Sequence, residues 1–354
     1  MSEAIAGLEL SGNAEIVGRF ERQFAACIGR KFAIAVNSGT SALVASLVAA
    51  GVRPGTSVLV PDFGMIAAAF AIEAIGATPL PVDVDGEHWN IRAATLEAAD
   101  VVGCSALVLI ENYGALFEVA DVCQVARRLS LPVIEDAAEA FSGHHEGIAA
   151  GRSGDLACFS FYANKHITTG EGGAIVTDDA ELAELAKTYT RMAFGKVEAN
   201  RYLHSMRAAS MRLSGMQAAL GIAQLQNLQD IVVERDAIAS RYRELLDGLG
   251  QFRMQRRHRG RDANWVFPIT LADGNRQRRD RLIDLLRENG IETRPFFEPL
   301  HRQRALSCFS ARDDDFPNSS RLADTGLYLP LWVGLRRATI DRICSELVNC
   351  YKRA

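Results

Sequence analysis

The segment 159–173 reads FSFYANKHITTGEGG, and it places Lys165 between two apolar runs. The first run ends near Phe161, and the second is Ala174-Ile175-Val176-Thr177, which follows a glycine-rich turn. Both runs are predicted strands. Burial between strands disfavours the charged form of a lysine and lowers its pKa, which suits an amine that acts as a nucleophile. The alternative is a solvent-exposed loop lysine, and the remainder of the chain has to distinguish the two.

The composition is that of an ordinary globular protein. The chain has 354 residues, of which 48% are hydrophobic and 23% charged, and its length predicts about two domains. The net charge of -4 shows no basic excess, so no nucleic-acid partner is expected. Two basic runs, 253–261 and 276–281, are interpreted as solvated surface, with contact to an anionic ligand as the weaker alternative.

The cysteines and the N-terminus indicate a cytoplasmic protein. The seven cysteines form no C-x-x-C pair and no cluster with zinc spacing, so reduced thiols and no metal site are expected. No basic segment followed by an apolar run starts the chain, and no signal peptide is predicted. The apolar stretches 42–52 and 63–77 are too short to span a membrane, or are interrupted by Glu73. The cysteines are Cys27, Cys104, Cys123, Cys158, Cys308, Cys344 and Cys350.

Strands and helices alternate through the first half of the chain. Continuous apolar strands separated by helices predict an α/β fold with a mainly parallel sheet covered by helices on both faces. Ligand-binding residues of such sheets lie at the carboxyl ends of strands, where Asn37, Asp136 and Lys165 fall. Strands are predicted at 32–36, 57–60, 78–82, 106–110 and 132–135, and helices at 13–29, 42–50, 64–75 and 119–129.

The pattern changes after Gly173. Helices are predicted at 179–192 and, as one long helix, at 216–247. The long helix is expected to lead into a smaller C-terminal α+β domain, with a break near 230–250. We therefore assign 10–235 to a large domain and 236–354 to a small one. The small domain should contain a strand at 265–270, a helix at 278–289, a stretch at 291–297 and a closing helix at 339–351.

Three features together predict a pyridoxal phosphate site. The turn Asn37-Ser38-Gly39-Thr40-Ser41 opens a helix and suits a phosphate group, although such residues also serve as simple helix caps. Asp136 ends a strand and can keep a pyridine nitrogen protonated. Lys165 can hold the cofactor aldehyde as a Schiff base and transfer protons. The cofactor expected is pyridoxal 5'-phosphate, with pyridoxamine phosphate as its intermediate form.

Five segments, in order, resemble the DegT-type pyridoxal-phosphate-dependent sugar aminotransferases, which have the type I aspartate aminotransferase fold. The resemblance runs from about residue 10 to the C-terminus. The stretch 293–301 is most similar to perosamine-synthase-like members, which make 4-amino-4,6-dideoxy sugars. The segments are NSGTSAL at 37–43, EDAAEA at 135–140, FSFYANKHITTGEGG at 159–173, QAALG at 217–221 and GIETRPFF at 290–297.

The resemblance assigns catalytic roles to two residues and a cofactor contact to a third. Lys165 would carry the Schiff base, and Asp136 would pair with the pyridinium nitrogen, unless it is only a helix cap. Glu139 would lie beside the phenolic oxygen of the ring, where the family has Gln or Glu. The alternative for Glu139 is an exposed glutamate in the first turn of a helix.

The resemblance also assigns the phosphate site, with two departures. Gly39, Thr40 and Ser160 would bind the phosphate, although Ser160 could be a buried serine without that role. Met65 replaces an aromatic residue that many relatives stack on the cofactor, and its sulfur can still contact a ring. Ser210 replaces an asparagine that reaches the partner subunit's phosphate.

Four further positions are weighed against the family. Glu111 replaces a common histidine, and the sequence offers no physical reason for the change. His166 follows the lysine and is either a substrate contact or a hydrogen-bonded structural histidine. Arg294 would contact anionic groups of the substrate. Phe63 could substitute for the missing aromatic residue, but strand alternation turns it away from Met65.

The resemblance implies transfer of an amino group from an amino acid, by family habit glutamate, to a nucleotide-linked keto sugar of the 4-keto-6-deoxy class. It also implies a homodimer with a shared active site. One alternative is a nucleotide-sugar dehydratase with the same cofactor, which Lys165 disfavours. Another is a regulatory protein that binds the cofactor without turnover.

Overall fold

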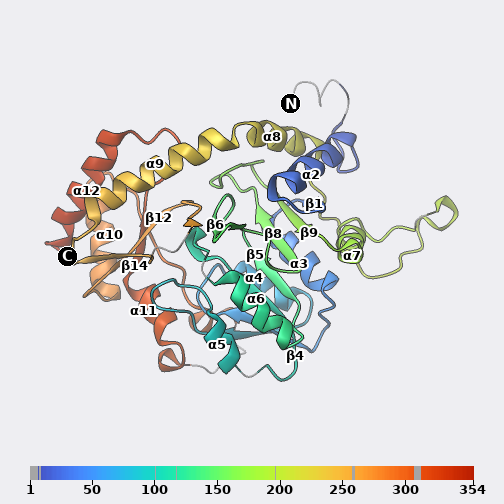
Figure 1. Ribbon diagram of the computed structural model, residues 1–354, viewed down its shortest axis with the longest axis horizontal. Helices are drawn as coiled ribbons and strands as arrows, with labels where there is room; N and C mark the ends of the chain where they lie inside the picture. The colour runs from blue at the N-terminus through green and yellow to red at the C-terminus, as the bar shows by residue number, and fades with distance from the viewer. Residues whose placement is uncertain are drawn as a thin grey trace.

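The computed structural model describes residues 7, 9–99, 101–116, 118–195, 197–256, 260–306 and 312–354. Within these residues, the chain forms a large α/β unit around a seven-stranded sheet and a smaller unit around a four-stranded sheet (Figure 1). The long helix α9 (Leu228–Leu246) passes from one unit to the other along the edge of the molecule (Figure 1).

The seven-stranded sheet is mainly parallel, as predicted. Strand β9 alone among the described strands of this sheet runs antiparallel to its neighbours β1 and β8. The other pairings, from β8 across to β3, are parallel. The strands in sheet order are β1 (Phe32–Val36), β9 (Gly173–Thr177), β8 (Leu156–Ser160), β5 (Val133–Asp136), β4 (Cys104–Ile110), β2 (Ser57–Pro61) and β3 (Thr78–Val82).

Helices bury their apolar sides on both faces of this sheet. One core cluster holds Phe20 and Phe24 of α2 with Val122 of α6, and another holds Leu47 of α3 with Ile72 of α4. Strands that are covered on both faces consist of continuous apolar runs, which is why these strands could be predicted from the sequence. The helices are α2 (Glu15–Ile28), α3 (Gly39–Ala49), α4 (Ala67–Ala74), α5 (Ala93–Ala98), α6 (Val119–Arg128), α7 (Ala180–Thr190) and α8 (Gly215–Gln226).

The smaller unit has an antiparallel sheet in the order β10-β12-β14-β13 and its own apolar core. The predicted α+β character of this region is confirmed, while the exact domain boundary stays a prediction. Its elements are α9 (Leu228–Leu246), β10 (Phe252–Met254), β12 (Phe267–Leu271), α10 (Arg276–Glu288), β13 (Arg294–Pro295), α11 (Pro317–Thr325), β14 (Gly326–Leu329) and α12 (Arg337–Tyr351).

Short elements complete the fold. A three-stranded sheet is formed by β6 (His144–His145), β7 (Ile148–Ala149) and β11 (Gly260–Arg261). Single 3₁₀ turns are η1 (Asn112–Gly114), η2 (Glu198–Asn200), η3 (Leu300–Arg302) and η4 (Asp313–Asp315). These short elements were not predicted, because each is too brief to show a hydrophobic period. The nine-residue helix α11 was not predicted either.

Two predicted helices have different bounds. The helix predicted at 216–247 is two helices, because α8 ends at Gln226 and α9 starts at Leu228. Asn227 between them has φ -102° and ψ 6°, and its side-chain amide donates to the carbonyl of Ala223 (2.9 Å). This local bond competes with continuation of the helix. Helix α3 starts at Gly39 rather than Ala42, since Ser38 caps it.

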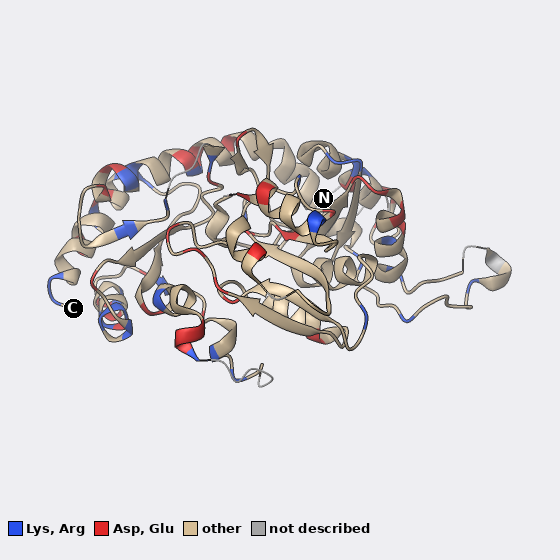
Figure 2. Cartoon of the chain, turned by 60° about the horizontal axis from the view of Figure 1, so that its bottom comes forward, with Lys and Arg blue, Asp and Glu red and all other residues tan. Residues whose placement is uncertain are grey.

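Charged residues of both signs are distributed over the surface (Figure 2). The basic run 276–281 lies on α10, where Arg276 and Arg278 pair with acidic residues. Arg279 is buried and donates to the carbonyls of Ala323 (2.7 Å) and Gly326 (3.2 Å), so the prediction of solvated surface is wrong for that residue. Part of the run 253–261, and Cys308, lie outside the described residues. The six described cysteines are free thiols. None of the described helices is long and apolar enough to cross a membrane.

Candidate active site

The carboxyl ends of β1, β5 and β8 meet at one cavity of about 360 Å³. Helix α3 begins just after β1, Asp136 is the last residue of β5, and Lys165 lies in the loop after β8. The sheet order places these three strands within four positions of one another. The cavity is lined by seven of the predicted site residues, namely Gly39, Thr40, Met65, Asp136, Glu139, Ser160 and Lys165.

Lys165 lies with its ammonium group over an indole ring. Its Nζ is 3.7 Å from the ring centroid of Trp265, and the Trp265 Nε1–H donates to the carbonyl of Asn164 (3.1 Å). Burial lowers the pKa of Lys165, whereas the nearby charges of Glu139 and Asp136 act in the opposite direction. A larger fraction of neutral amine is therefore present near neutral pH than for an exposed lysine, which is what a nucleophile requires.

Asp136 places a carboxyl group deep in the cavity wall. Its side chain is buried, and one oxygen accepts a hydrogen bond from the Ala138 N–H (3.2 Å). Burial raises its pKa to about 6, opposed by the Ala138 N–H and the charge of Lys165. Above pH 6 it is ionised, and a buried carboxylate is most stable when paired with a positive group. A protonated ring nitrogen is a partner of this kind.

Glu139 is buried as well. Its carboxylate accepts a hydrogen bond from the Tyr113 N–H (2.7 Å), and burial raises its pKa to about 7. The alternative of an exposed first-turn glutamate is therefore wrong. Lys165 and Asp136 both contribute to the pKa of Glu139, so the three groups titrate as neighbours.

The first turn of α3 forms the opposite end of the cavity. Ser38 caps the helix by accepting a hydrogen bond from the Ser41 N–H (3.0 Å). A β-carbon added at Gly39 would lie 3.1 Å from the β-carbon of Ser160, so glycine permits this close approach of helix and strand. The first amides of a helix have no intrahelical acceptor and suit a phosphate.

These residues fit pyridoxal phosphate. A helix N-terminus for the phosphate, a buried carboxylate for the ring nitrogen and an amine for the aldehyde line the same cavity. The model of the DegT/DnrJ/EryC1/StrS aminotransferase family matches residues 6–348. The chain belongs to this family. It is a pyridoxal-phosphate-dependent sugar aminotransferase, as the sequence resemblance implied.

Relatives and solved structures agree with the family assignment. The chain is 38% identical to GDP-perosamine synthase of Caulobacter vibrioides over 341 residues, which covers 96% of this chain and 91% of that protein. It is 30% identical to GDP-perosamine synthase of Escherichia coli O157:H7, with 99% and 94% covered. A crystal structure of a family aminotransferase from Brucella abortus superimposes with a TM-score of 0.91 at 29% identity, covering 99% and 94%. The predicted similarity to perosamine-synthase-like members is confirmed.

The position of the family's stacking aromatic residue is occupied by Met65, which lines the cavity and is 44% exposed. Phe63 turns the other way, as strand alternation predicted, and packs against Tyr113 and Phe296. Sequence reasoning missed three aromatic residues that also line the cavity, Tyr162, Trp265 and Phe297. Tyr162 and Phe297 lie in two of the segments that resemble the family, at 159–173 and 290–297, whereas no local pattern marks Trp265.

The two residues predicted to contact the substrate, His166 and Arg294, lie in different environments. His166 is buried, its Nε2 is hydrogen-bonded to the carbonyl of Ala263, and burial lowers its pKa to about 3. This is the arrangement of a structural histidine, and His166 does not line the described cavity. Arg294 is exposed and lines a second cavity of about 580 Å³, which shares Tyr162, Asn164 and Trp265 with the first.

Two departures from the family remain to be placed. Ser210 does not line the described cavity and lies at the base of a long arm, where its hydroxyl accepts from Arg212 (3.3 Å). The described part of the arm, residues 191–195 and 197–210, begins and ends at the bridge between Arg191 and Ser210 and projects away from the body of the molecule at the right of Figure 1. Glu111 is buried beside Glu135, and burial raises its pKa well above the usual range. Nothing in the structure explains glutamate at this position.

Proposed function

We propose that the protein transfers an amino group from glutamate to a nucleotide-linked 4-keto-6-deoxy sugar. The observation that carries this proposal is the meeting of Lys165, Asp136 and the first turn of α3 in one cavity. When bound, pyridoxal phosphate supplies an aldehyde that receives amines and a ring that accepts electrons. Every other requirement, from binding to proton transfer, falls to residues of this chain.

Each of the three groups has a distinct role. The amides of Gly39 and Thr40, with the hydroxyl groups of Thr40 and Ser160, would hold the phosphate. The Asp136 carboxylate would hold a proton at the ring nitrogen. The neutral amine of Lys165, favoured by burial, would move a proton between the substrate carbon and the cofactor carbon in both halves of the reaction.

A lysine in the cavity favours transfer over dehydration. A dehydratase that retains the amino form of the cofactor suits a site without a lysine, because no amine then competes to recapture the cofactor. Lys165 lies in the cavity wall, in the position that the family motif assigns to it. We therefore retain the aminotransferase over the dehydratase.

The second cavity supports the sugar-nucleotide half of the proposal. It is larger than the cofactor cavity and shares three lining residues with it, so a substrate could extend from one into the other. Arg294 and Arg342 line it and would contact phosphate groups, with Arg294 first releasing Glu292, to which it is paired (3.1 Å). Trp332, 51% exposed, supplies an aromatic face. The names of the two perosamine synthases, which include GDP, favour the same class of substrate.

We further propose a homodimer in the cytoplasm. The arm carries the exposed apolar side chains Val197, Tyr202 and Leu203, which a second copy of the chain would cover. Ser210 would then approach the partner's cofactor phosphate. Free thiols are typical of a reducing compartment.

A substrate panel tests the proposal. Purified holoenzyme is incubated with glutamate together with one 4-keto-6-deoxy sugar at a time, linked to GDP, dTDP or UDP, and 2-oxoglutarate is measured. We expect 2-oxoglutarate in stoichiometric amounts with at least one sugar, and none with Lys165→Ala. If glutamate bleaches the cofactor absorbance but none of the sugars restores it, the sugar assignment is wrong. A cofactor spectrum that does not respond to any amino acid would point to the regulatory alternative.

A further inference from the structure

The end of strand β2 is bound to the C-terminal part of the chain through Asp62. This carboxylate is fully buried, and it accepts hydrogen bonds from the backbone N–H of His301 (3.0 Å) and from its ring Nδ1 (2.8 Å). The carbonyl of Asp62 accepts from the N–H of Leu300 (2.8 Å). The carboxylate and the carbonyl of Asp62 are therefore hydrogen-bonded to residues of η3, and Asp62 does not line the described cofactor cavity.

The imidazole of His301 lies between two carboxylates. Its Nδ1 contacts Asp62, and its Nε2 lies 2.9 Å from an oxygen of Asp313. An ionised carboxylate only accepts hydrogen bonds, so both ring nitrogens must donate, and only the imidazolium ion can do this. The ring is buried, with its side chain 2% exposed, and it stacks on Phe316 with a centroid distance of 5.1 Å.

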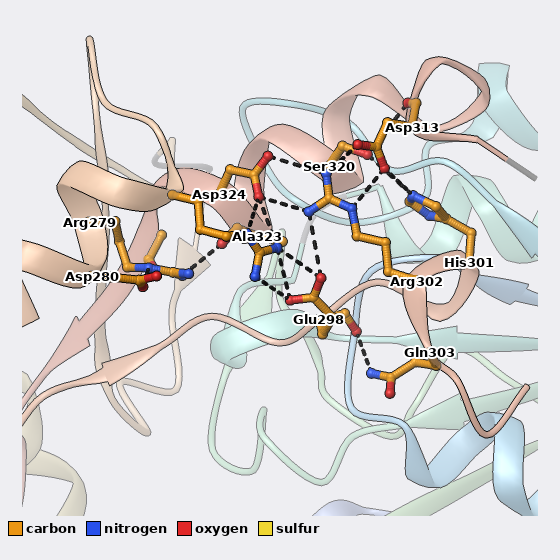
Figure 3. A network of polar contacts seen from close by, with 12 residues as sticks. Arg279, Asp280, Glu298, His301, Arg302, Gln303, Asp313, Ser320, Ala323 and Asp324 are labelled. Atoms are coloured by element: carbon orange, nitrogen blue, oxygen red, sulfur yellow. Dashed lines mark hydrogen bonds and ion pairs between the residues drawn. The ribbon is translucent and has the colours of Figure 1, made fainter.

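A wider ionic network holds this arrangement (Figure 3). Arg302 pairs with Asp313 on one side (2.7 Å) and with Asp324 on the other (2.8 Å). Arg276 joins Asp324 to Glu298. The groups that face His301 from neighbouring elements are thus the acids Asp62 and Asp313, the cation Arg302, and the hydroxyl of Ser320 at 3.4 Å.

Both sides of the His301–Asp62 contact lead directly into the cofactor cavity. Met65, three residues after Asp62, lines it, as does Phe297, four residues before His301. The segment between Asp62 and Met65 is held by Asn112, whose side-chain amide donates to the carbonyl of Phe63 (3.0 Å). It also packs closely on β4, since a β-carbon at Gly64 would lie 2.8 Å from Ile110, another lining residue. Phe297 is held in turn by Tyr113, whose hydroxyl accepts from its N–H (3.2 Å).

We propose that His301 is a positioning residue for the cofactor site. As an imidazolium bridging Asp62 and Asp313, it fixes Met65 and Phe297 on the rim of the cavity and so strengthens binding of pyridoxal phosphate. Loss of the ring's charge removes one of its two hydrogen bonds to carboxylates and loosens the rim. The device is chemically distinct from the catalytic groups, because His301 itself does not line the described cavity.

The pH dependence follows from the contacts. Burial acts to lower the pKa of His301, but the hydrogen bonds to Asp62 and Asp313 outweigh it and raise the pKa above its ordinary value of 6.5. Because the folded pKa exceeds the unfolded one, the contribution is fully present below pH 6.5. It is lost as the pH rises through the folded pKa.

Cofactor binding in His301→Gln measures the effect. The amide of Gln can donate a hydrogen bond but cannot carry the charge. The Kd for pyridoxal phosphate is determined by absorbance from about pH 6 to pH 9. Contributions of Lys165, Asp136 and Glu139 cancel in the ratio of the two constants. We expect the variant to bind about tenfold more weakly at pH 6, within the usual range of coupling between sites, and equally well at the alkaline end.

A second readout needs no cofactor. The chain has seven histidines, and the imidazole resonance that disappears in His301→Gln identifies His301 in spectra of the apoprotein. Its titration midpoint should lie above 6.5 in wild type and should fall in Asp313→Asn, which removes one carboxylate. Asp313→Asn should shift the alkaline loss of cofactor affinity by the same amount.

The matched control is His88→Gln. His88 is also buried and pairs with an aspartate, Asp85 (2.9 Å), but neither residue lines the described cofactor cavity. Its Kd ratio to wild type should be near one at every pH. A His301→Gln ratio that stays constant across the pH range would reduce His301 to a structural role and overturn the proposal. If His301→Gln fails to fold, the imidazole midpoint that falls in Asp313→Asn identifies His301 instead. A wild-type His301 midpoint at or below 6.5 would also overturn the proposal.

Discussion

At the residue scale, the site is a set of charges held away from water. Lys165, Asp136 and Glu139 line one cavity. Burial lowers the pKa of the lysine and raises the pKa of both carboxyl groups, so it favours the neutral form of each. Ionising buried groups costs free energy, and clusters of buried groups with shifted pKa values are common at catalytic sites. The residues were predictable because each stands in a local motif. Trp265, which covers the amine, was not.

Lys165→Ala should abolish turnover without unfolding the protein. In the proposed mechanism the lysine supplies both the amine that holds the cofactor and the base, and loss of a general base alone costs about 10²- to 10⁴-fold in rate. The visible absorption band should disappear while the unfolding temperature of the apoprotein changes little. In wild type, borohydride reduction followed by peptide mapping should place the cofactor on Lys165 alone. Label on any other lysine, such as the exposed Lys187, would contradict this role.

Asp136→Asn should have opposite effects on binding and stability. The buried carboxylate has a pKa raised from 3.8 to about 6, so above pH 6 its ionisation costs the apoprotein up to about 3 kcal/mol. The amide avoids this cost, and the apo variant should unfold at higher denaturant concentration at pH 7. Below about pH 4, where Asp136 is protonated in both folded and unfolded states, the difference should vanish.

The same variant should bind the cofactor more weakly. A neutral amide loses a charge-assisted hydrogen bond worth about 1.5–3 kcal/mol, so Kd at pH 7 should rise about 10- to 100-fold. Equal cofactor affinity in wild type and Asp136→Asn, measured by absorbance titration, would show that the carboxylate does not hold the ring nitrogen.

At the element scale, the decisive unit is β1, its turn and α3. Ser38 caps α3 and Gly39 permits contact with β8, so two small residues build the end of the cavity where we propose that the phosphate binds. The turn was predicted as a phosphate site, but α3 was predicted to begin three residues late because its first turn is polar. The break at Asn227 was missed for a related reason, since apolar periodicity continues through a single interrupting residue.

Gly39→Ala should separate cofactor affinity from stability. The added methyl group would crowd the β-carbon of Ser160 at 3.1 Å and push the first turn of α3 away from β8. We expect the Kd for pyridoxal phosphate to rise about tenfold, a loss of about 1.4 kcal/mol. Gly18→Ala is the control, because Gly18 is also helical and its added β-carbon meets only Arg22 Nη1, at 3.4 Å. The control should gain about 0.5–1 kcal/mol of stability without a change in affinity. An unchanged Kd in Gly39→Ala would mean that the phosphate lies elsewhere.

At the scale of the whole molecule, the contacts between the two units were beyond sequence reasoning. Asp62 and His301 are separated by 239 positions in the chain, and Asp83 accepts hydrogen bonds from Asn318 and Ser319 over a similar separation. Single-sequence patterns report local periodicity and carry no information about which distant polar residues meet. The sheet, by contrast, was predictable because its strands are apolar throughout.

The arm makes a prediction about assembly. Tyr202 and Leu203 are 80% and 71% exposed, and Leu203→Glu would place a charge in a surface that we expect a second copy to cover. Light scattering should show a dimer for wild type and a monomer for the variant, with weaker cofactor binding in the monomer. Val102→Glu, also at an exposed apolar side chain (87%) but before β4, should remain dimeric. A dimeric Leu203→Glu protein with normal affinity would remove the arm from the interface.

Transfer of nitrogen from amino acid to sugar is the central claim, and isotope labelling follows it directly. Holoenzyme is incubated with ¹⁵N-glutamate and the nucleotide-linked 4-keto-6-deoxy sugar that responds in the panel, and the sugar product is analysed by mass spectrometry. We predict one ¹⁵N atom in the sugar for wild type and none for Lys165→Ala. A product that has lost a hydroxyl group and gained no ¹⁵N would contradict the assignment as an aminotransferase.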